Sequence, residues 1–266
     1  MEPPAGRTTN ARVVRVCEGE RVEADDVVAV EEPLEIRVNE RPVSVTMRTP
    51  GDDFELAAGF LFTEGILRDA GDVDAIRHWG SPNVVRVALR EGVTLDLQRL
   101  QRHFYATSSC GVCGKTSIEA LRVMTARVTS SVAIAAAAVA AMPAALRAQQ
   151  RAFDATGGIH AAGIFDAGGA LLRVREDVGR HNAVDKAIGS FFLERAPLGD
   201  RALFVSSRTS FEIVQKAIVA SIPIVAAVGA PSSLAIELAN DFGVTLIGFV
   251  REGRFNVYAN GGRVTA

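Results

Sequence analysis

Hydrophobic and polar residues alternate in two short segments near the start of the chain. Residues 34–38 and 43–47 place apolar side chains at every second position, and the polar stretch 39–42 separates them. Such alternation is typical of strands buried on one face, so the pattern predicts a β-hairpin. After a break at 49–53, apolar residues recur at three- and four-residue intervals, which predicts a helix that ends at Gly65.

From about residue 156 the pattern changes to short apolar runs that alternate with helical spacings. Strands are predicted at 161–165, 170–175, 202–205, 222–228 and 245–250, with helices at 182–193, 210–220 and 232–241. Short connections between alternating strands and helices are typical of α/β domains, so we predict a three-layer α/β domain with a largely parallel sheet. A last strand at 254–258 is predicted to cover an edge of that sheet.

These segments divide the chain into four predicted parts. They are a disordered tail at 1–10, a small α+β subdomain at 11–105 with a further strand at 84–89, a cysteine loop and helical connection at 106–155, and the α/β domain at 156–266. Within the connection we predict helices at 116–123 and 132–153, with a candidate break of the second at Pro143.

No segment is predicted to enter a membrane. The N-terminus lacks the apolar core of a signal peptide, and the Ala-rich run at 132–142 is too short to span a bilayer. We therefore expect a soluble protein of the cytoplasm.

Composition and charge exclude some classes of function. The 266 residues include 29 Lys and Arg against 31 Asp and Glu, for a net charge of −2. This balance argues against a nucleic-acid binder held by backbone contacts. Three cysteines are too few for a disulfide framework. Cys17 lies in an apolar-alternating stretch, so we expect it to be a buried structural residue.

Cys110 and Cys113 form a C-x-x-C motif in a loop of small and flexible residues. Such a pair can be a redox pair, half of a metal site or a sulfur relay. Zinc is disfavoured because no second C-x-x-C exists, and His160 and His181 lack ligand spacing. A thioredoxin-type oxidoreductase would place the pair directly after a strand, whereas the polar run 106–109 precedes it here.

Three predicted strand–helix junctions concentrate polar and charged residues, at 175–186, 206–212 and 229–233. A helix N-terminus beside an arginine is a favourable binding site for an anion. Open α/β sheets also bind their ligands at the carboxyl ends of their strands. A simpler interpretation is that these residues only cap helices and form local ion pairs. Because Arg251 and Arg254 also follow the last α/β strand, we favour a large polyanionic ligand such as a nucleotide.

Taken together, the motifs resemble the formate dehydrogenase accessory sulfurtransferase family, the FdhD/NarQ family. The segments that carry the resemblance are 49–56, 59–65, 110–114, 156–162, 176–186 and 248–251. The long segment EDVGRHNAVDK at 176–186 and the cysteine motif are the most specific.

The resemblance implies a sulfur carrier that acts as a sulfurtransferase. It implies that Cys110 accepts persulfide sulfur from a cysteine desulfurase, and that Cys113 assists this transfer or resolves the persulfide. The sulfur would pass to the molybdenum bis-guanine-dinucleotide cofactor before that cofactor enters formate dehydrogenase. A homodimer is expected as well.

The resemblance also places the cofactor-binding stretch near the C-terminus. Its residues are Phe249, Val250, Arg251, Glu252, Gly253 and Arg254. From the polar junctions we add candidate contacts for the guanine nucleotide parts, which are His181, Asn182, Asp185, Ser207, Arg208 and Thr209.

The C-terminal domain of the family resembles the cytidine deaminase fold. Deaminases hold zinc through H-x-E at one helix start and P-C-x-x-C at the next. Here the corresponding helix starts, at 180–183 and 207–210, contain no cysteine pair, and no Glu follows His181 at the needed spacing. We therefore expect this fold without zinc. Two other functions stay open, a cofactor chaperone that transfers no sulfur and a dithiol oxidoreductase.

Overall fold

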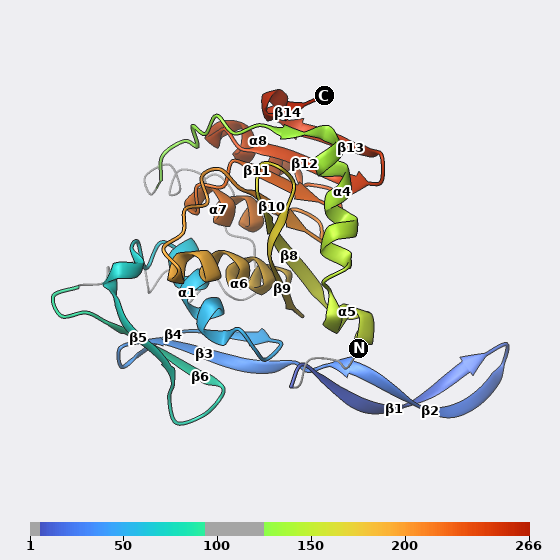
Figure 1. Ribbon diagram of the computed structural model, residues 1–266. Helices are drawn as coiled ribbons and strands as arrows, with labels where there is room; N and C mark the ends of the chain where they lie inside the picture. Colours follow the sequence, from blue (N-terminus) through green and yellow to red (C-terminus); the bar gives the residue numbers. More distant parts are fainter. Residues whose placement is uncertain (1–5, 94–124) are drawn as a thin grey trace.

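The computed structural model of the chain describes residues 6–93 and 125–266. A small sheet with one helix packs against a larger α/β domain, and a long two-stranded ribbon extends away from both (Figure 1). The predicted combination of an α+β N-terminal part and an α/β C-terminal domain is therefore confirmed.

The N-terminal part is a four-stranded sheet in the order β4-β3-β6-β5, with helix α1 on one face. Its elements are β3 (Glu32–Val38), β4 (Arg41–Arg48), α1 (Asp53–Thr63), the 3-10 turn η1 (Ala70–Asp72), β5 (Val73–His78) and β6 (Val84–Leu89). Leu34, Ile36 and Val38 alternate inward and pack with Leu56 and Leu61 of α1. The predicted hairpin, helix and strand are confirmed. β5 was not predicted, because none of its residues is fully buried and its alternation is weak.

A two-stranded antiparallel ribbon precedes this sheet. Its strands are β1 (Thr8–Cys17) and β2 (Glu20–Ala29). Glu18 and Gly19 join them with φ angles of 51° and 90°, the geometry of a tight hairpin turn. The disordered tail predicted at 1–10 is contradicted from Thr8 onward, and Cys17, expected to be buried, is exposed. Most ribbon residues are exposed, so the one-sided burial that gives a strand its sequence pattern is missing here.

The larger domain is built on a six-stranded sheet in the order β13-β12-β11-β10-β8-β9. Its strands are β8 (His160–Phe165), β9 (Leu171–Asp177), β10 (Ala202–Val205), β11 (Ile224–Ala227), β12 (Thr245–Arg251) and β13 (Arg254–Ala259). β11 runs parallel to β10 and β12, but the pairings of β8 with β9, of β8 with β10 and of β12 with β13 are antiparallel. The sheet is therefore mixed and not largely parallel. β13 covers one edge, as predicted, and β9 forms the other.

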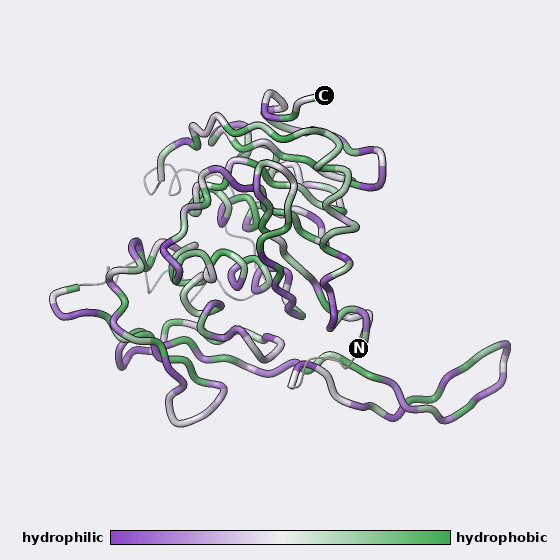
Figure 2. Tube along the Cα trace, viewed as in Figure 1, coloured by the Kyte–Doolittle hydropathy of each residue, from purple (hydrophilic) through white to green (hydrophobic). Residues whose placement is uncertain are grey.

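Helices cover both faces of this sheet and give the predicted three layers (Figure 1). They are α4 (Ala136–Arg147) on one face and α6 (Arg180–Leu193), α7 (Phe211–Val219) and α8 (Ser233–Phe242) on the other. In Figure 2 the central strands are coloured mainly green, whereas the ribbon alternates between purple and green. The remaining elements are α5 (Arg151–Thr156), the 3-10 turn η2 (Gly261–Arg263) and the two-residue strands β7 (Ile134–Ala135) and β14 (Val264–Thr265).

The helix predicted at 132–153 is two helices. Pro143 lies inside α4 without ending it, and the break comes after Arg147. The helix predicted at 116–123 lies outside the described residues.

The two parts of the chain meet where α1 crosses α6 backbone to backbone. A Cβ added to Gly59 would overlap the carbonyl oxygen of Asp185, and one added to Gly189 would overlap that of Glu55. Only glycine lets the helices approach this closely. The crossing therefore presses the polar first half of α6 against the N-terminal part.

Candidate functional site

Three loops converge at the carboxyl ends of β10, β11 and β12, and the first two are the predicted junctions at 206–212 and 229–233. The amide of Gly229 donates to the carbonyl of Ser207 at 3.2 Å, and the amide of Thr209 donates to that of Ala230 at 3.1 Å. The amide of Phe249 donates to the carbonyl of Gly229 at 3.1 Å. These backbone bonds fix the loops side by side at one edge of the domain, which we call the carboxyl edge.

Two histidines lie at the carboxyl edge. His181, in the first turn of α6, has its Nε2 3.3 Å from the Ser210 hydroxyl and 3.8 Å from a Glu212 carboxylate oxygen. Burial, with help from Arg180, lowers the pKa of His181 to about 4. Burial and Arg180 also lower the pKa of His160, at the start of β8. Both imidazoles are therefore neutral near pH 7 and can accept a proton or a hydrogen bond.

The loop after β10 holds exposed and buried polar groups close together. Arg208 is exposed, and the hydroxyl of Ser207 donates to its carbonyl at 2.9 Å. Thr209 is 1 % exposed, and its hydroxyl has no hydrogen-bond partner among the described residues. Buried polar groups are nearly always paired, so this hydroxyl is a candidate contact for a ligand.

The end of β12 combines an exposed aromatic ring with a strained backbone. Phe249 has a φ of 53°, in the left-handed region that disfavours residues other than glycine, and it is 40 % exposed. β12 bulges between Gly248 and Arg251. Val250 is 1 % exposed and packs in the core. Although it belongs to the predicted binding stretch, its side chain anchors the strand and does not face a ligand. The four residues that follow Val250 in the predicted binding stretch are exposed: Arg251, Glu252, Gly253 and Arg254.

Asn182 and Asp185, predicted as ligand contacts, lie inside the protein. The Asn182 amide donates to the carbonyl of Met47 at 2.7 Å and to Asp177 at 3.1 Å. Asp185 is 2 % exposed and accepts a hydrogen bond from the Thr63 hydroxyl at 2.7 Å. The reason is that α1 and β4 cover this side of α6, which the spacing within α6 does not reveal. The structure therefore assigns both side chains to the interface between the two parts of the chain.

A buried cluster missed by the sequence interpretation lies beside them. Lys216 Nζ is 3.0 Å from Asp185, from the Thr63 hydroxyl and from Glu64, and we call these four residues the Lys216 cluster. Burial raises the pKa of Asp185 to about 6 although Lys216 opposes the change. Burial alone would lower the pKa of Lys216, but Asp185 and Glu64 raise it. The one available signal was Lys216 between the apolar residues of α7 that pack in the core.

A second buried ion pair fixes the loop that precedes α1. Lys186 Nζ lies 2.7 Å from Asp177 and donates to the carbonyl of Thr49 at 2.8 Å. Burial lowers the pKa of Lys186, and Asp177 counteracts the change. Together with the Lys216 cluster, this pair positions the first turn of α6, and hence His181, at the carboxyl edge.

Cys110 and Cys113 lie outside the described residues, so their approach to the carboxyl edge stays a prediction. Within residues 6–93 and 125–266, no group of three or more His, Cys, Asp or Glu side chains is arranged to hold a metal ion. No helix in this part of the chain is long and apolar enough to cross a membrane.

Comparison with known proteins gives consistent matches along the chain. A sequence model of the FdhD/NarQ family matches residues 29–265. Sulfur carrier protein FdhD of Mycolicibacterium paratuberculosis is 49 % identical over 97 % of this chain and 98 % of its own length. The protein of the same name from Streptomyces coelicolor is 49 % identical, over 97 % of this chain and 96 % of its own.

A solved structure matches as well. The crystal structure of a protein from Desulfotalea psychrophila, assigned as a formate dehydrogenase accessory protein, superposes with a TM-score of 0.80 and 28 % identity. The match covers 97 % of this chain and 99 % of that one. The likeness to cytidine deaminases stays a prediction. By sequence and by structure, this chain belongs to the FdhD/NarQ family.

Proposed function

We propose that this chain is a sulfur carrier that serves a formate dehydrogenase. It would take sulfur on Cys110 from a cysteine desulfurase and deliver it to the molybdenum bis-guanine-dinucleotide cofactor before the cofactor enters the enzyme. The observation that carries the proposal is similarity over 97 % of the chain to relatives named sulfur carrier protein. The C-x-x-C pair supplies the chemistry that such a role needs.

The first step is a thiol exchange. The Cys110 thiolate attacks the outer sulfur of the desulfurase persulfide, a new S–S bond forms on Cys110, and the desulfurase cysteine leaves as a thiolate. No external oxidant or reductant is needed, because one S–S bond replaces another. Lys115 follows the motif and can favour the thiolate that starts the reaction.

The second step releases the sulfur. The Cys113 thiolate attacks the inner sulfur of the Cys110 persulfide, a Cys110–Cys113 disulfide forms, and hydrosulfide leaves toward the cofactor. The two cysteines supply the two electrons, so an external dithiol must reduce the disulfide before the next cycle.

The carboxyl edge is the place we propose for the guanine nucleotide parts of the cofactor, which is the substrate of this transfer. The exposed ring of Phe249 can stack on a base, and the guanidinium groups of Arg208 and Arg251 are exposed for phosphates. The hydroxyl of Thr209, which has no hydrogen-bond partner within the described part of the chain, adds a hydrogen-bonding group beside them.

Intact-mass spectrometry tests the sulfur-carrier role directly. The protein is incubated with a cysteine desulfurase and L-cysteine without reductant. We expect a reducible gain of about 32 Da per sulfur in the wild type and in Cys113→Ala, and its loss in Cys110→Ala. Cys17→Ala is the matched control, because Cys17 is an exposed cysteine that the mechanism does not use.

The result also separates the alternative functions. A mass gain that persists in Cys110→Ala but is lost in Cys17→Ala would contradict the assignment of Cys110 as the residue that carries the sulfur. No gain in any variant, together with intact guanine-nucleotide binding, would favour a cofactor chaperone. Disulfide reductase activity without nucleotide binding would favour a dithiol oxidoreductase.

A further inference from the structure

β9 is an edge strand with a neighbour on one side only among the described strands. β8 pairs with it through residues 160–165, and no described strand pairs with its outer side. An edge strand presents backbone N–H and C=O groups that a further strand can pair with. This edge is far from β12 and β13 in the strand order, so it is distinct from the carboxyl ends of those strands.

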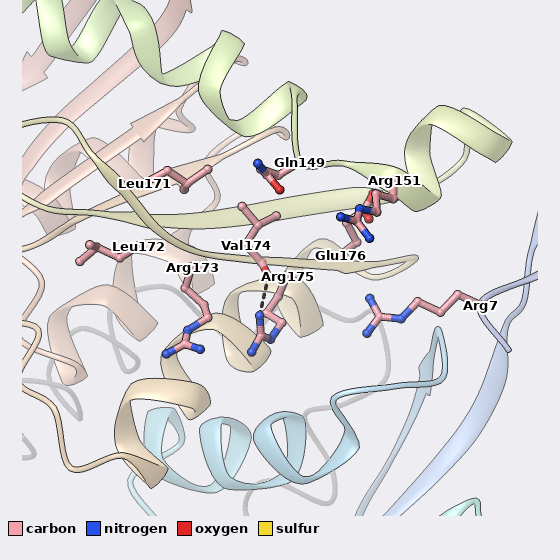
Figure 3. Close-up of a pocket in the computed structure, with 9 residues that line it drawn as sticks. All are labelled: Arg7, Gln149, Arg151, Leu171, Leu172, Arg173, Val174, Arg175 and Glu176. Atoms are coloured by element: carbon pink, nitrogen blue, oxygen red, sulfur yellow. Dashed lines mark hydrogen bonds between the residues drawn. The ribbon is translucent and has the colours of Figure 1, made fainter. Parts of the chain in front are cut away.

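A hollow of about 620 Å³ runs along this edge, and we call it the β9 slot (Figure 3). Its lining consists of six consecutive residues of β9, at 171–176, together with Arg7, Gln149 and Arg151. Successive side chains of a strand point to opposite faces, so a hollow that touches six in a row follows the edge and not one face. Six residues of a strand span about 20 Å. The slot therefore has the dimensions of an extended peptide more than of a compact anion.

Arginines dominate the charged side chains that line the slot. The lining contains Arg7, Arg151, Arg173 and Arg175 but a single carboxylate, that of Glu176. That carboxylate is already used, because it accepts hydrogen bonds from the amides of residues 152 and 153, each at 2.9 Å. Arg7, Arg173 and Arg175 each pair with a carboxylate outside the lining, so among the described residues Arg151 supplies the uncompensated positive charge that an acidic ligand would meet.

Several guanidinium groups keep donors for such a ligand. Arg175 is fully engaged, with two bonds to Glu55 and one to the Val174 carbonyl. Arg173 meets Glu194 through one nitrogen, and its buried Nε has no partner among the described residues. Arg151 is exposed and forms no ion pair within the described part of the chain.

Arg7 also keeps donors, since it reaches Asp52 through one of its nitrogens. A guanidinium group carries five N–H donors, so Arg7, Arg151 and Arg173 each retain several. Leu172, which is 42 % exposed, adds an apolar contact to the same edge.

We propose that the β9 slot binds an extended acidic segment of a partner protein, which adds a strand to β9 and places its carboxylates on Arg7, Arg151 and Arg173. A second copy of this chain is a poorer occupant, because pairing β9 with itself would bring the arginines of both copies together. This docking site is independent of the cysteines, so it would stand even if no sulfur were transferred.

Fluorescence anisotropy with a labelled peptide tests the site. The probe is an acidic peptide of about eight residues with Glu on both faces of the strand it would form, because Arg173 and Arg151 lie on opposite faces of β9 (Figure 3). It is titrated with the full-length protein. We expect saturable binding that Arg151→Gln and Arg173→Gln each weaken about tenfold. Arg12→Gln is the matched control and should not change the affinity, because Arg12 lies on the ribbon with 80 % of its side chain exposed.

Two altered peptides separate strand addition from plain charge attraction. A peptide with Lys in place of Glu should not bind, and an acidic peptide N-methylated at alternate amides should bind about tenfold more weakly, because it cannot pair with the strand edge. Equal binding of the methylated peptide, equal binding to Arg151→Gln, or no saturable binding up to about 1 mM would overturn the proposal. Self-association that Arg151→Gln strengthens would assign the edge to a second copy instead.

Discussion

The Lys216 cluster and the β9 slot contain the same kinds of charged group in opposite settings. In the cluster, the lysine is 5 % exposed and meets three oxygen partners at 3.0 Å. In the slot, Arg151 is exposed without an ion-pair partner among the described residues, and Arg173 keeps a buried nitrogen without an acceptor. Enclosed and fully paired charge holds the two parts of the chain together, whereas partly unpaired charge at an open edge remains available to a ligand.

The largest expected effect comes from breaking the cluster with Lys216→Met. The change leaves the Asp185 carboxylate buried without its cation, so we expect the free energy of unfolding to fall by about 3–5 kcal/mol. Urea unfolding followed by circular dichroism measures this loss. The double variant Lys216→Met with Asp185→Leu should recover much of it, because the fully buried Asp185 carboxylate is removed together with its cation. A single variant within about 1 kcal/mol of wild type would contradict the role given to the cluster.

The helix crossing beside the cluster gives the next largest effect. In Gly59→Ala the new methyl group meets the backbone of α6, and we expect a loss of about 3 kcal/mol in the same unfolding measurement. Gly199→Ala is the matched control, because its nearest neighbouring atom would be 4.0 Å from the new Cβ. Equal stability of the two variants would show that α1 and α6 can separate without cost.

Protonation of His181, which lies between the Lys216 cluster and the carboxyl edge, is expected to change the free energy of unfolding by a smaller amount that depends on pH. Its pKa is about 4 in the folded protein and near 6.5 in the unfolded chain, so the unfolded state binds more protons between these values. The contribution of His181 to the free energy of unfolding is therefore lost as the pH falls from 6.5 toward 4. Asp185 acts in the opposite direction, because its pKa is raised in the folded state to about 6.

Comparison of His181→Gln with wild type at each pH isolates the histidine. We expect the variant to gain stability relative to wild type as the pH falls through this window, measured by urea unfolding at a series of pH values. NMR titration of the wild-type imidazole should show it still mostly neutral at pH 5. A titration midpoint near 6.5 would contradict the lowered pKa of the half-buried His181 imidazole.

The smallest effect is expected in the slot. Arg151→Gln removes an exposed charge without a partner among the described residues, so the free energy of unfolding should change by less than about 0.5 kcal/mol. The same variant should nevertheless weaken binding of the acidic peptide. A loss of stability above about 1 kcal/mol would instead place Arg151 in the structural framework and weaken the contrast with Lys216.

The sequence predicted the elements of the α/β domain well, because their periodicity reflects burial on one or both sides. β10 spans Ala202–Val205, as predicted, and the three helices on one face differ from the predictions by two residues or fewer at each end. The direction of β8 could not be predicted, since a short apolar run has no polarity of its own. The ribbon was missed although the stretch before Cys17 alternates, because both faces of the ribbon are exposed and this alternation does not correspond to burial on one face.

The candidate site was predicted in part, and the limits follow from the fold. The three junctions do meet, because strand ends of one sheet share an edge. Asn182 and Asp185 were misplaced because their partners, Met47 and Thr63, are more than a hundred residues away. Lys216 was missed for the same reason, since a buried lysine can only be explained by the distant groups that pair with it.

The glycine crossing of α1 and α6 also bears on how this protein can be divided. A C-terminal domain prepared without the N-terminal part would expose the glycine surface of α6, with Asp185 still inside reach of Lys216 but without Thr63 and Glu64. Such a fragment would present to water a surface shaped for another helix, and it would tend to associate with other chains. The two parts therefore form one structural unit, and a replacement for either part would have to reproduce the close crossing of α1 and α6.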